Sequence, residues 1–336
     1  MNSRYGTNFR IAIFGESHAA AIGVEIEGVP AGTAIDMAEL QRFMERRAPG
    51  RDGLSTARRE KDEPEFLCGV KGGVATGAPI AAIIRNSDVR PGDYGDMANV
   101  PRPGHADYPA EVRFGGHQDR SGGGHFSGRL TAALCVAGGV ALQMLGRMGL
   151  SVSAKAVRIG GETDPERMRK AIADARAAGD SVGGVVEAEV RGLPVGVGDP
   201  MFAGLENRIA QVVFGIPAVK GIEFGEGFAA ADMKGSENND PYRMADGRVT
   251  PVSNHAGGIL GGLSTGAPVV FRVAFKPTPS IAKEQDSVDL AKGMDVKLSV
   301  KGRHDPCVAL RAVPCVEAAA AIAVCDAMLE WRKAAQ

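Results

Sequence analysis

The sequence predicts an α+β fold, a β-α-β sandwich in which antiparallel sheets pack on central helices, and three observations lead to this prediction. Apolar and charged residues alternate in stretches such as Ile22, Val24 and Ile26, which is typical of strands that bury one face. The stretch from Phe126 to Leu145 is apolar nearly all round, which is typical of a helix buried at the centre of a domain. Two phrases also recur in the same order, which indicates an internal pseudo-twofold duplication.

The repeated phrases are long enough to align the two halves of the chain. EIEGVPAGTAID at 25–36 returns as EVRGLPVGVGDP at 189–200, and GVATGAPI at 73–80 returns as GLSTGAPV at 262–269. The spacing between the phrases is longer in the second copy, and the polar stretch 235–251 is the candidate insertion. We therefore treat residues 1–336 as one domain with pseudo-repeats of about 1–150 and 151–336.

Capping signals and apolar spacing predict further elements. Asp36 with Glu39 three residues later predicts the start of a helix whose apolar face holds Leu40, Phe43 and Met44. The second copy predicts an equivalent helix through Phe202, Leu205, Ile209 and Val212. Other predicted elements are a strand at Phe9–Phe14, a strand through Val269, Phe271, Val273 and Phe275, a helix at Thr163–Ala178 capped by Thr163 and Glu166, and an alanine-rich amphipathic helix at Val316–Trp331.

The composition limits the possible functions. The chain has 336 residues, 44% of them hydrophobic and 24% charged, with a formal net charge of −1. This balance gives no global attraction to nucleic acid or to an anionic membrane. We also expect neither a signal peptide nor a segment long enough to span a membrane. The five cysteines are scattered without a CxxC spacing, so we expect reduced thiols in a cytoplasmic protein and no metal site.

Histidines and basic residues gather in polar, glycine-rich breaks. The six histidines are His18, His105, His117, His125, His255 and His304. Because histidine changes charge near neutral pH and loops often carry functional groups, we expect one cationic, proton-active site built from distant loops. Each motif also has a purely structural interpretation: GESH as a solvated turn, ERRAPGR as an exposed helix end, and KGRHDPC as an Asp-Pro turn with a surface ion pair.

The glycine-rich stretch GGHQDRSGGGHFSGR directly precedes the predicted central helix. Free N–H groups at the start of a helix, with arginine and histidine nearby, can hold an anion. A second match, GEGFAA at 225–230, resembles a dinucleotide fingerprint but is followed by polar residues, so we interpret it as a chance match.

Taken together, FGESH, RPGHADY, the GGG…SGRLT loop, SNHAGGILGGLSTG, KPTPSI and KGRHDPCVALRAVP resemble the chorismate synthase family, from residue 14 to about 314. The resemblance implies a lyase of the shikimate pathway of aromatic amino-acid biosynthesis. Such an enzyme converts 5-enolpyruvylshikimate 3-phosphate to chorismate and phosphate by anti-1,4-elimination. It also implies a requirement for reduced FMN (FMNH2) without net redox change, and a cytoplasmic homotetramer. It leaves open whether the flavin is reduced by an external reductase or by the protein's own use of NADPH.

The resemblance also implies roles for individual residues. His18 and His105 would be the acids that assist the flavin and the phosphate, and Asp305 would act with flavin N5 in removing the proton. The implied FMN positions are His125, Phe126, Ser127, Pro217, Ala218, Gly261, Lys276, Pro277, Thr278, Pro279, Ser280 and Arg303. The implied substrate positions are Arg47, Arg51, Ser127, Arg129 and Arg303.

The chain departs from the family pattern at His125–Leu130, where the family usually has R-S-S-A-R-E. An imidazole then stands where a fixed guanidinium is usual, so we expect ligand binding to weaken as the pH rises through the pKa of His125. Gly53 stands where a basic residue is usual, and Arg51 could take over its contact. Two other functions remain open: an FMN-dependent reductase, which would consume NADPH, and a non-catalytic relative that binds a phosphorylated ligand.

Overall fold

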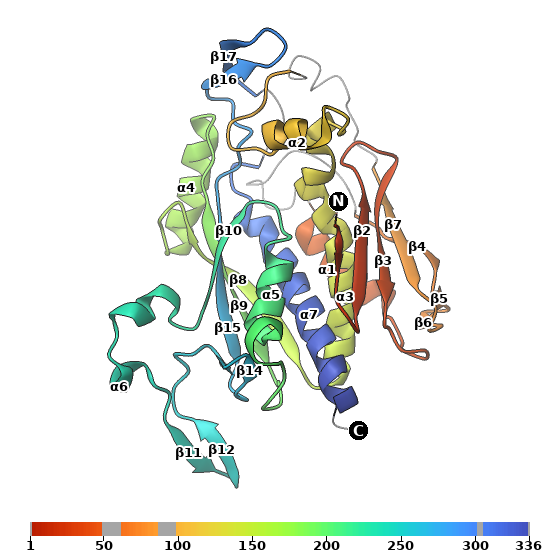
Figure 1. The fold of residues 1–336 in the computed structure, drawn as a ribbon, viewed down its shortest axis with the longest axis vertical. Coiled ribbons are helices and arrows are strands. Elements are labelled where there is room, and N and C mark those ends of the chain that lie inside the picture. The colour runs from red at the N-terminus through yellow and green to blue at the C-terminus, as the bar shows by residue number, and fades with distance from the viewer. Residues whose placement is uncertain (1, 49–61, 87–98, 301–304, 335–336) are drawn as a thin grey trace.

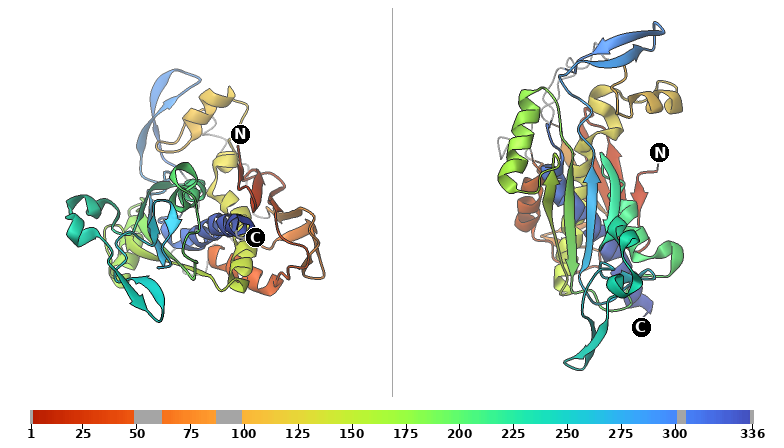
Figure 2. Two further views of the ribbon diagram at one scale, coloured as in Figure 1. Left: turned by 60° about the horizontal axis from the view of Figure 1, so that its bottom comes forward. Right: turned by 90° about the vertical axis from the view of Figure 1, so that its left-hand side faces the viewer.

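A computed structural model describes residues 2–48, 62–86, 99–300 and 305–334 and shows two antiparallel sheets on either side of a layer of helices (Figure 1). The strands of the first sheet lie in the order β1-β2-β3-β7-β4, and those of the second in the order β10-β15-β9-β8. The two sheets enclose the helices from opposite sides, as the view along the helix layer shows (Figure 2). The predicted α+β sandwich is therefore confirmed.

The first half of the chain supplies one sheet and two long helices. Its elements are β1 (Arg4–Tyr5), β2 (Arg10–Gly15), β3 (Ala21–Glu27), α1 (Met37–Arg47), β4 (Glu65–Cys68), β5 (Val70–Lys71), β6 (Val74–Ala75), β7 (Ile80–Arg85), α2 (Asp107–Phe114) and α3 (Thr131–Arg147), with short 3-10 turns η2 (Ser121–Phe126) and η3 (Gly128–Leu130) before α3.

The second half supplies the other sheet and the longest helix. Its elements are β8 (Ser151–Ile159), α4 (Pro165–Ala177), β9 (Gly184–Arg191), η4 (Met201–Ala203), α5 (Leu205–Val213), β10 (Val219–Phe224), η5 (Gly227–Asp232), α6 (Gly235–Asn238), β11 (Tyr242–Ala245), β12 (Arg248–Pro251), β13 (Ile259–Leu260), β14 (Leu263–Ser264), β15 (Val269–Phe275), β16 (Gln285–Asp289), β17 (Met294–Leu298) and α7 (Ala309–Ala334).

The two halves repeat the same pairing of strands, which confirms the internal duplication. β3 pairs with β7 as β9 pairs with β15, and the neighbours β2 and β4 correspond to β8 and β10. An isolated bridge joins Ala34 to Val74 in the first half, and its equivalent joins Gly198 to Leu263 in the second. The extra length of the second half is the segment between β10 and β13, whose β11–β12 hairpin projects from the body (Figure 1).

Alternating strand residues form the inner faces of both sheets, as their sequence predicted. Ile22, Val24 and Ile26 of β3 are completely buried, and Val186 and Val190 of β9 are their counterparts. In register, Val24 lies opposite Ala82 of β7, and Val186 lies opposite Val273 of β15. Both faces pack on the helices, so the core is continuous between the sheets.

The helices α3 and α7 cross at the centre and approach closely. A Cβ added to Gly138 of α3 would lie 2.2 Å from the Cβ of Ala318 in α7, so only glycine fits there. By length and apolar composition, the regions that contain α3 and α7 could each span a membrane. This contradicts our expectation that no segment reaches that length. In both, 89% of the most apolar window is buried inside the protein, as expected of core helices.

Several predicted boundaries were wrong. Phe202 is not on α5 but precedes it in η4, and 88% of its surface is exposed. The central helix α3 begins at Thr131 rather than Phe126, because Ser127 has an extended backbone and caps the short turn η3 that precedes α3. The N-cap of α4 is Asp164 rather than Thr163. Finally, α7 begins earlier than predicted and is buried nearly all round rather than amphipathic.

The two ends of the described chain are joined at one carboxylate. Asp326 of α7 is 2% exposed, and its Oδ1 accepts hydrogen bonds from the backbone N–H groups of Thr7, Asn8 and Phe9 at 3.0, 2.5 and 2.8 Å. Three donors to a single buried carboxylate oxygen fix the start of β2 against the last helix.

Candidate active site

One cavity of about 660 Å³ lies where α3 and α7 begin, at the end of the helix layer. Both halves of the chain line it. From the first half come Arg47, Arg102, Gly104, His105, Gly122, His125, Phe126, Ser127 and Arg129, and from the second come Pro217, Ala218, Lys220, Lys276, Thr278, Pro279, Ser280, Asp305 and Arg311. Most of the residues predicted for a common site are therefore brought together.

The glycines of η2 bring two histidines to the same loop. A Cβ added to Gly122 would lie 2.2 Å from Cε1 of His18, and one added to Gly123 would lie 3.1 Å from Cε1 of His105. Both glycines have positive φ angles, so a side chain there would be strained as well as blocked. His105 lines the cavity, and His18 lies behind Gly122, which lines it. The two imidazoles therefore flank adjacent residues of one loop.

His105 is held by an acid and an arginine. Its Nδ1 lies 2.5 Å from Oδ1 of Asp107, and Arg102 binds both oxygens of the same carboxylate at 2.7 and 2.8 Å. Burial would raise the pKa of Asp107, but its bonds to Arg102 and His105 outweigh burial and lower this pKa below its usual value. Because an ionised carboxylate only accepts, the Nδ1 of His105 carries the proton. Its Nε2 then remains for a ligand.

Two arginines predicted to bind substrate share one buried carboxylate. Arg47 at the end of α1 and Arg129 in η3 each donate to a different oxygen of Asp62, whose side chain is completely buried. Arg47 also donates to Thr131 Oγ1 at 3.0 Å, and Arg129 to Asn86 Oδ1 at 3.1 Å. Burial would raise the pKa of Asp62, but the charges of Arg47 and Arg129 outweigh it and lower this pKa. Two guanidinium groups and one carboxylate leave this cluster positive.

Asp305 also lines the cavity and is held by another arginine. Arg311, in the first turn of α7, donates to Asp305 Oδ2 at 2.5 Å and, through Nε, to the backbone oxygen of Arg47 at 3.0 Å. Arg311 therefore links Asp305, the expected base, to the cluster formed by Arg47, Arg129 and Asp62. Arg51 and Arg303, both predicted to contact ligands, lie outside the described residues.

The segment after β15 forms the wall contributed by the second half. Lys276 donates to the backbone oxygen of Gly104, and burial together with the nearby charge of Lys220 lowers the pKa of Lys276. Ser280 accepts a bond from Arg102 at 3.2 Å. The hydroxyl of Thr278 lines the cavity, is buried and has no hydrogen-bond partner within the described parts of the chain. Such an atom is suited to bind a ligand.

His125 does not present a free ring nitrogen to the cavity. Its Nδ1 lies 2.8 Å from the backbone oxygen of Gly15, and its Nε2 lies 2.7 Å from Ser3 Oγ. A carbonyl only accepts, so Nδ1 carries a proton, and each ring nitrogen has a hydrogen-bond partner. The imidazole therefore anchors β2 to the glycine-rich loop. Its contacts do not favour the expectation that it binds an anion in place of the guanidinium that is usual in the family.

Four predicted or singled-out residues lie elsewhere. Gly261 is in the turn between β13 and β14 and does not line this cavity, and neither does Pro277, although its neighbours in the chain do. His117 also does not line it, and His255 contacts Asn238 and Asp240 in the projecting segment. Among the described histidines, the expectation that they mark one site therefore applies to His18, His105 and His125, and His304 lies outside the described residues.

With this geometry established, comparison with known proteins identifies the family. Residues 9–329 match the chorismate synthase family. This chain belongs to the chorismate synthase family. It is 49% identical to chorismate synthase of Chitinophaga pinensis, over 98% of this chain and 97% of that protein. It is 45% identical to the enzyme of Korarchaeum cryptofilum, over 98% of each. A crystal structure of chorismate synthase superimposes with a TM-score of 0.76 at 26% identity, covering 97% of this chain and 93% of that one.

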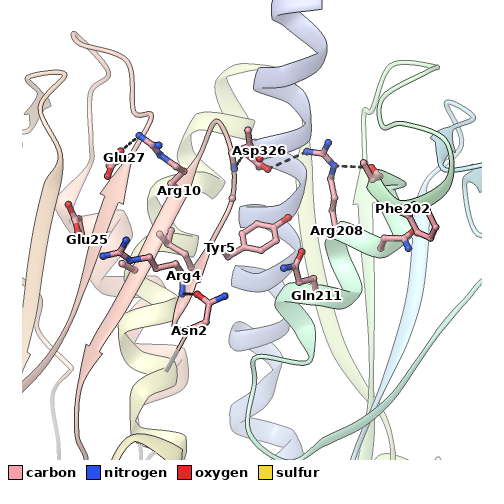
Figure 3. Close-up of a pocket in the computed structure, with 16 residues that line it drawn as sticks. Asn2, Arg4, Tyr5, Arg10, Glu25, Glu27, Phe202, Arg208, Gln211 and Asp326 are labelled. Atoms are coloured by element: carbon pink, nitrogen blue, oxygen red, sulfur yellow. Dashed lines mark hydrogen bonds and ion pairs between the residues drawn. The ribbon is translucent and has the colours of Figure 1, made fainter.

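A second cavity of about 600 Å³ lies between the N-terminal strands, α5 and α7 (Figure 3). Two of its three arginines form ion pairs with acids. Arg10 pairs with Glu27, and Arg208 pairs with Asp326 at 3.3 Å and with Glu330 at 2.5 Å. Four of the six motifs that resemble the chorismate synthase family contribute residues to the first cavity, namely RPGHADY, the GGG…SGRLT loop, KPTPSI and KGRHDPCVALRAVP, whereas no described residue of the six lines this second cavity.

Sequence reasoning missed four charged residues that line the first cavity or hold the side chains that do: Asp62, Arg102, Asp107 and Arg311. Arg102 and Asp107 could have been identified from the sequence, because both stand in RPGHADY, two or three residues from the histidine that they hold. Arg311 stands six residues after Asp305, which places it within two turns of the same helix start. No feature of the neighbouring sequence marks Asp62 as part of a site, since the charged stretch around it resembles any solvated loop.

Proposed function

We propose that this protein catalyses the elimination of phosphate from 5-enolpyruvylshikimate 3-phosphate to give chorismate, with reduced FMN as cofactor. One observation carries the proposal. Residues from five separate parts of the chain, at 47, 102–107, 122–129, 276–280 and 305–311, meet around one positively charged cavity that also holds a histidine with a fixed tautomer. Family membership makes the chain a lyase of aromatic biosynthesis, and the cavity suits a trianionic substrate.

The residues present fit a flavin beside a small anion. A cavity of about 660 Å³ lies within the usual range of 300–1,000 Å³ for ligand sites. Phe126, Pro217 and Ala218 offer apolar surface for a ring system, while Lys276 and the unpartnered hydroxyl of Thr278 suit a ribityl phosphate chain. When bound, reduced FMN supplies electron density that helps phosphate to leave, with no net oxidation. Ser127, Pro279, Ser280 and Arg303 would complete its contacts.

The arginine cluster would bind and orient the substrate. The substrate carries one phosphate and two carboxylates, and planar guanidinium groups bind such oxygens with two parallel hydrogen bonds. Asp62 holds Arg47 and Arg129 rigidly in position but neutralises only one of the two charges. Arg51, Ser127 and Arg303 are the further positions proposed for substrate. Binding would therefore weaken sharply with added salt or free phosphate.

The acid and base roles follow from the hydrogen-bond directions. The Nδ1–H group of His105 donates its hydrogen bond to Asp107, so a proton delivered to a reacting group would come from Nε2. His18, across Gly122, would be the second acid. Asp305 lines the cavity and accepts a hydrogen bond from Arg311, and its carboxylate would be the group that accepts the proton leaving the substrate.

Phosphate release provides the direct test. Purified protein with dithionite-reduced FMN under anaerobic conditions should release one phosphate and form one chorismate per substrate consumed. Omission of FMN, or use of oxidised FMN, is the control and should give no product. Stoichiometric NADPH consumption with turnover would instead support a reductase, and tight substrate binding without any phosphate release would support a non-catalytic relative.

We also propose, from the family relationship, that residues 1–336 act as one domain of two pseudo-repeats and assemble as a cytoplasmic homotetramer. Gly261, which does not line the cavity of its own chain, remains a proposed FMN contact. Light scattering of the purified protein should give about four times the mass of one 34.9 kDa chain. A monomeric mass with full activity would contradict the assembly.

A further inference from the structure

Two cysteines face each other where the central helices α3 and α7 cross. Cys135 of α3 donates a hydrogen bond to the sulfur of Cys315 in α7, with the two sulfur atoms 3.9 Å apart. Both residues are buried, at 0% and 3% exposure. Cys315 lines the cavity of the candidate active site, whereas Cys135 does not. One thiol of the pair is therefore accessible to small molecules through the cavity, and the other lies behind it.

The surroundings of Cys315 favour its thiolate. The hydrogen bond from Cys135 and the positive charge of Arg47 outweigh the effect of burial and lower the pKa of Cys315 to about 7. Other charges that act on the pair are Arg311, which also lowers the pKa of Cys315, and Asp62, which raises that of Cys135. Burial, the bond to Cys315 and the charge of Cys315 together raise the pKa of Cys135, so it keeps its proton.

The other described cysteines have different surroundings. Cys325 is buried in α7, and burial raises the pKa of its thiol to about 12. Cys307 is buried, and burial raises its pKa as well. Cys68 is exposed in β4 and contacts the backbone oxygen of Pro79 at 3.5 Å. The combination of cavity access, a nearby guanidinium and a second thiol in van der Waals contact distinguishes Cys315.

We propose that Cys315 is an oxidation site that opens onto the active-site cavity and that Cys135 is its resolving thiol. The oxidant is hydrogen peroxide or a small organic hydroperoxide. The Cys315 thiolate attacks one peroxide oxygen, the O–O bond breaks, and a sulfenic acid forms as the leaving oxygen takes up a proton to become water or an alcohol. The Cys135 sulfur then attacks the sulfenic sulfur, gives up its proton and releases water, which leaves a disulfide.

The electron balance and geometry of this sequence are simple. The two sulfurs lose two electrons, and the peroxide gains them to become two molecules of water, or one alcohol and one water. In a disulfide the sulfurs lie about 2.05 Å apart, so rotation of the two side chains must close most of the gap from 3.9 Å. The Cys315 sulfur would then turn away from the cavity. Oxidation would remove a negative charge from beside Arg47 and join the two halves of the core.

Mass spectrometry of peroxide-treated protein tests the proposal directly. The folded, full-length protein is exposed to hydrogen peroxide, then blocked with iodoacetamide and digested without reductant. We expect a cross-linked peptide pair that contains Cys135 and Cys315 and has lost two hydrogen atoms, and we expect it to disappear after reduction. Cys315 should also be alkylated at least about 10-fold faster than Cys325 in untreated protein at pH 7.5.

Single substitutions separate the two roles. In Cys135→Ala the reaction should stop at the sulfenic acid, detected as a dimedone adduct on Cys315. In Cys315→Ala, Cys135 should resist peroxide. Cys325→Ala is the matched control, since it also removes a buried α7 thiol, and should leave the cross-link unchanged.

Circular dichroism melts check that each variant is folded, and the alkylation rates of the unsubstituted protein decide the question if a variant does not fold. Cross-links that involve Cys68 alone, or equal alkylation of Cys315 and Cys325, would overturn the proposal. The proposal is independent of the proposed reaction, because it requires neither FMN nor substrate.

Discussion

Two of the cavities formed by the described residues, that of the candidate active site and that between the N-terminal strands, α5 and α7, are similar in volume and both contain arginines, yet their charges are arranged differently. In the second cavity Arg10 and Arg208 each face acids of their own, so the described charges largely cancel. In the first cavity Arg47 and Arg129 share the single carboxylate of Asp62, and Lys276 lies near Lys220. A count of arginines does not distinguish a binding site from a structural cleft, whereas incomplete compensation of charge does.

The largest expected effect of a single substitution is at the base proposed for the first cavity. Asp305→Asn keeps the shape of the side chain but removes its ability to accept a proton. We expect phosphate release to fall by about 10³-fold or more, within the usual range for loss of a general base. Flavin titration should show that FMN still binds, because the hydrogen bond from Arg311 to the side-chain oxygen can persist. Full activity of this variant would remove Asp305 from the mechanism.

Asp62→Asn tests the arginine cluster and should act mainly on stability. It removes the carboxylate that two buried guanidinium groups share, and the loss of one partner of a buried ion pair typically costs about 3–5 kcal/mol. Because the pKa of Asp62 is lowered in the folded state, its contribution is present above the unfolded pKa of about 4 and is lost as the pH falls through the folded value.

Urea denaturation of the unsubstituted protein and of this variant between pH 3 and pH 7 measures that contribution. The difference in unfolding free energy should be largest near pH 7 and shrink at acid pH. A difference that does not change with pH would mean that the charge of Asp62 is not what stabilises the cluster.

The smallest effect is expected in the second cavity. Arg10→Ala removes an exposed ion pair with Glu27, and such pairs are worth about 0–1 kcal/mol. Thermal unfolding should shift by no more than a few degrees, and the rate of phosphate release should stay within about twofold of the unsubstituted protein. If Arg10→Ala lost as much activity as is expected of Asp305→Asn, the proposed difference in charge compensation between the two cavities would be wrong.

The parts that the sequence predicted well depend on local pattern. Ile22, Val24 and Ile26 alternate because one face of a strand is buried, and alternation is visible without knowing what the face packs on. Asp36 lies at a helix start, where its side chain accepts from the N–H groups of Ala38 and Glu39 as the spacing predicted. The distribution of histidines and basic residues predicted one site built from distant loops, but the roles of His105, Lys276 and Asp305 in it came from the motifs of a known family.

The parts that were missed depend on contacts across the fold. Asp62 meets Arg129 from 67 positions away, and nothing near Asp62 in the sequence marks it as buried. Phe202 was placed on a helix because its spacing fits, but the turn before α5 directs it to solvent. The role of His125 required the positions of Ser3 and Gly15, which a motif comparison does not give.

The bonds from Thr7, Asn8 and Phe9 to Asp326 also bear on how the protein is made. Phe9 and Asp326 are 317 positions apart, so at a translation rate of 5–20 residues per second the ribosome adds the acceptor roughly 15–60 s after the donors. The opening strand of the nascent polypeptide therefore lacks its anchor for most of synthesis. We therefore expect the strands of the first sheet to be able to pair earlier, and the start of β2 to be fixed against α7 only after α7 has left the ribosome.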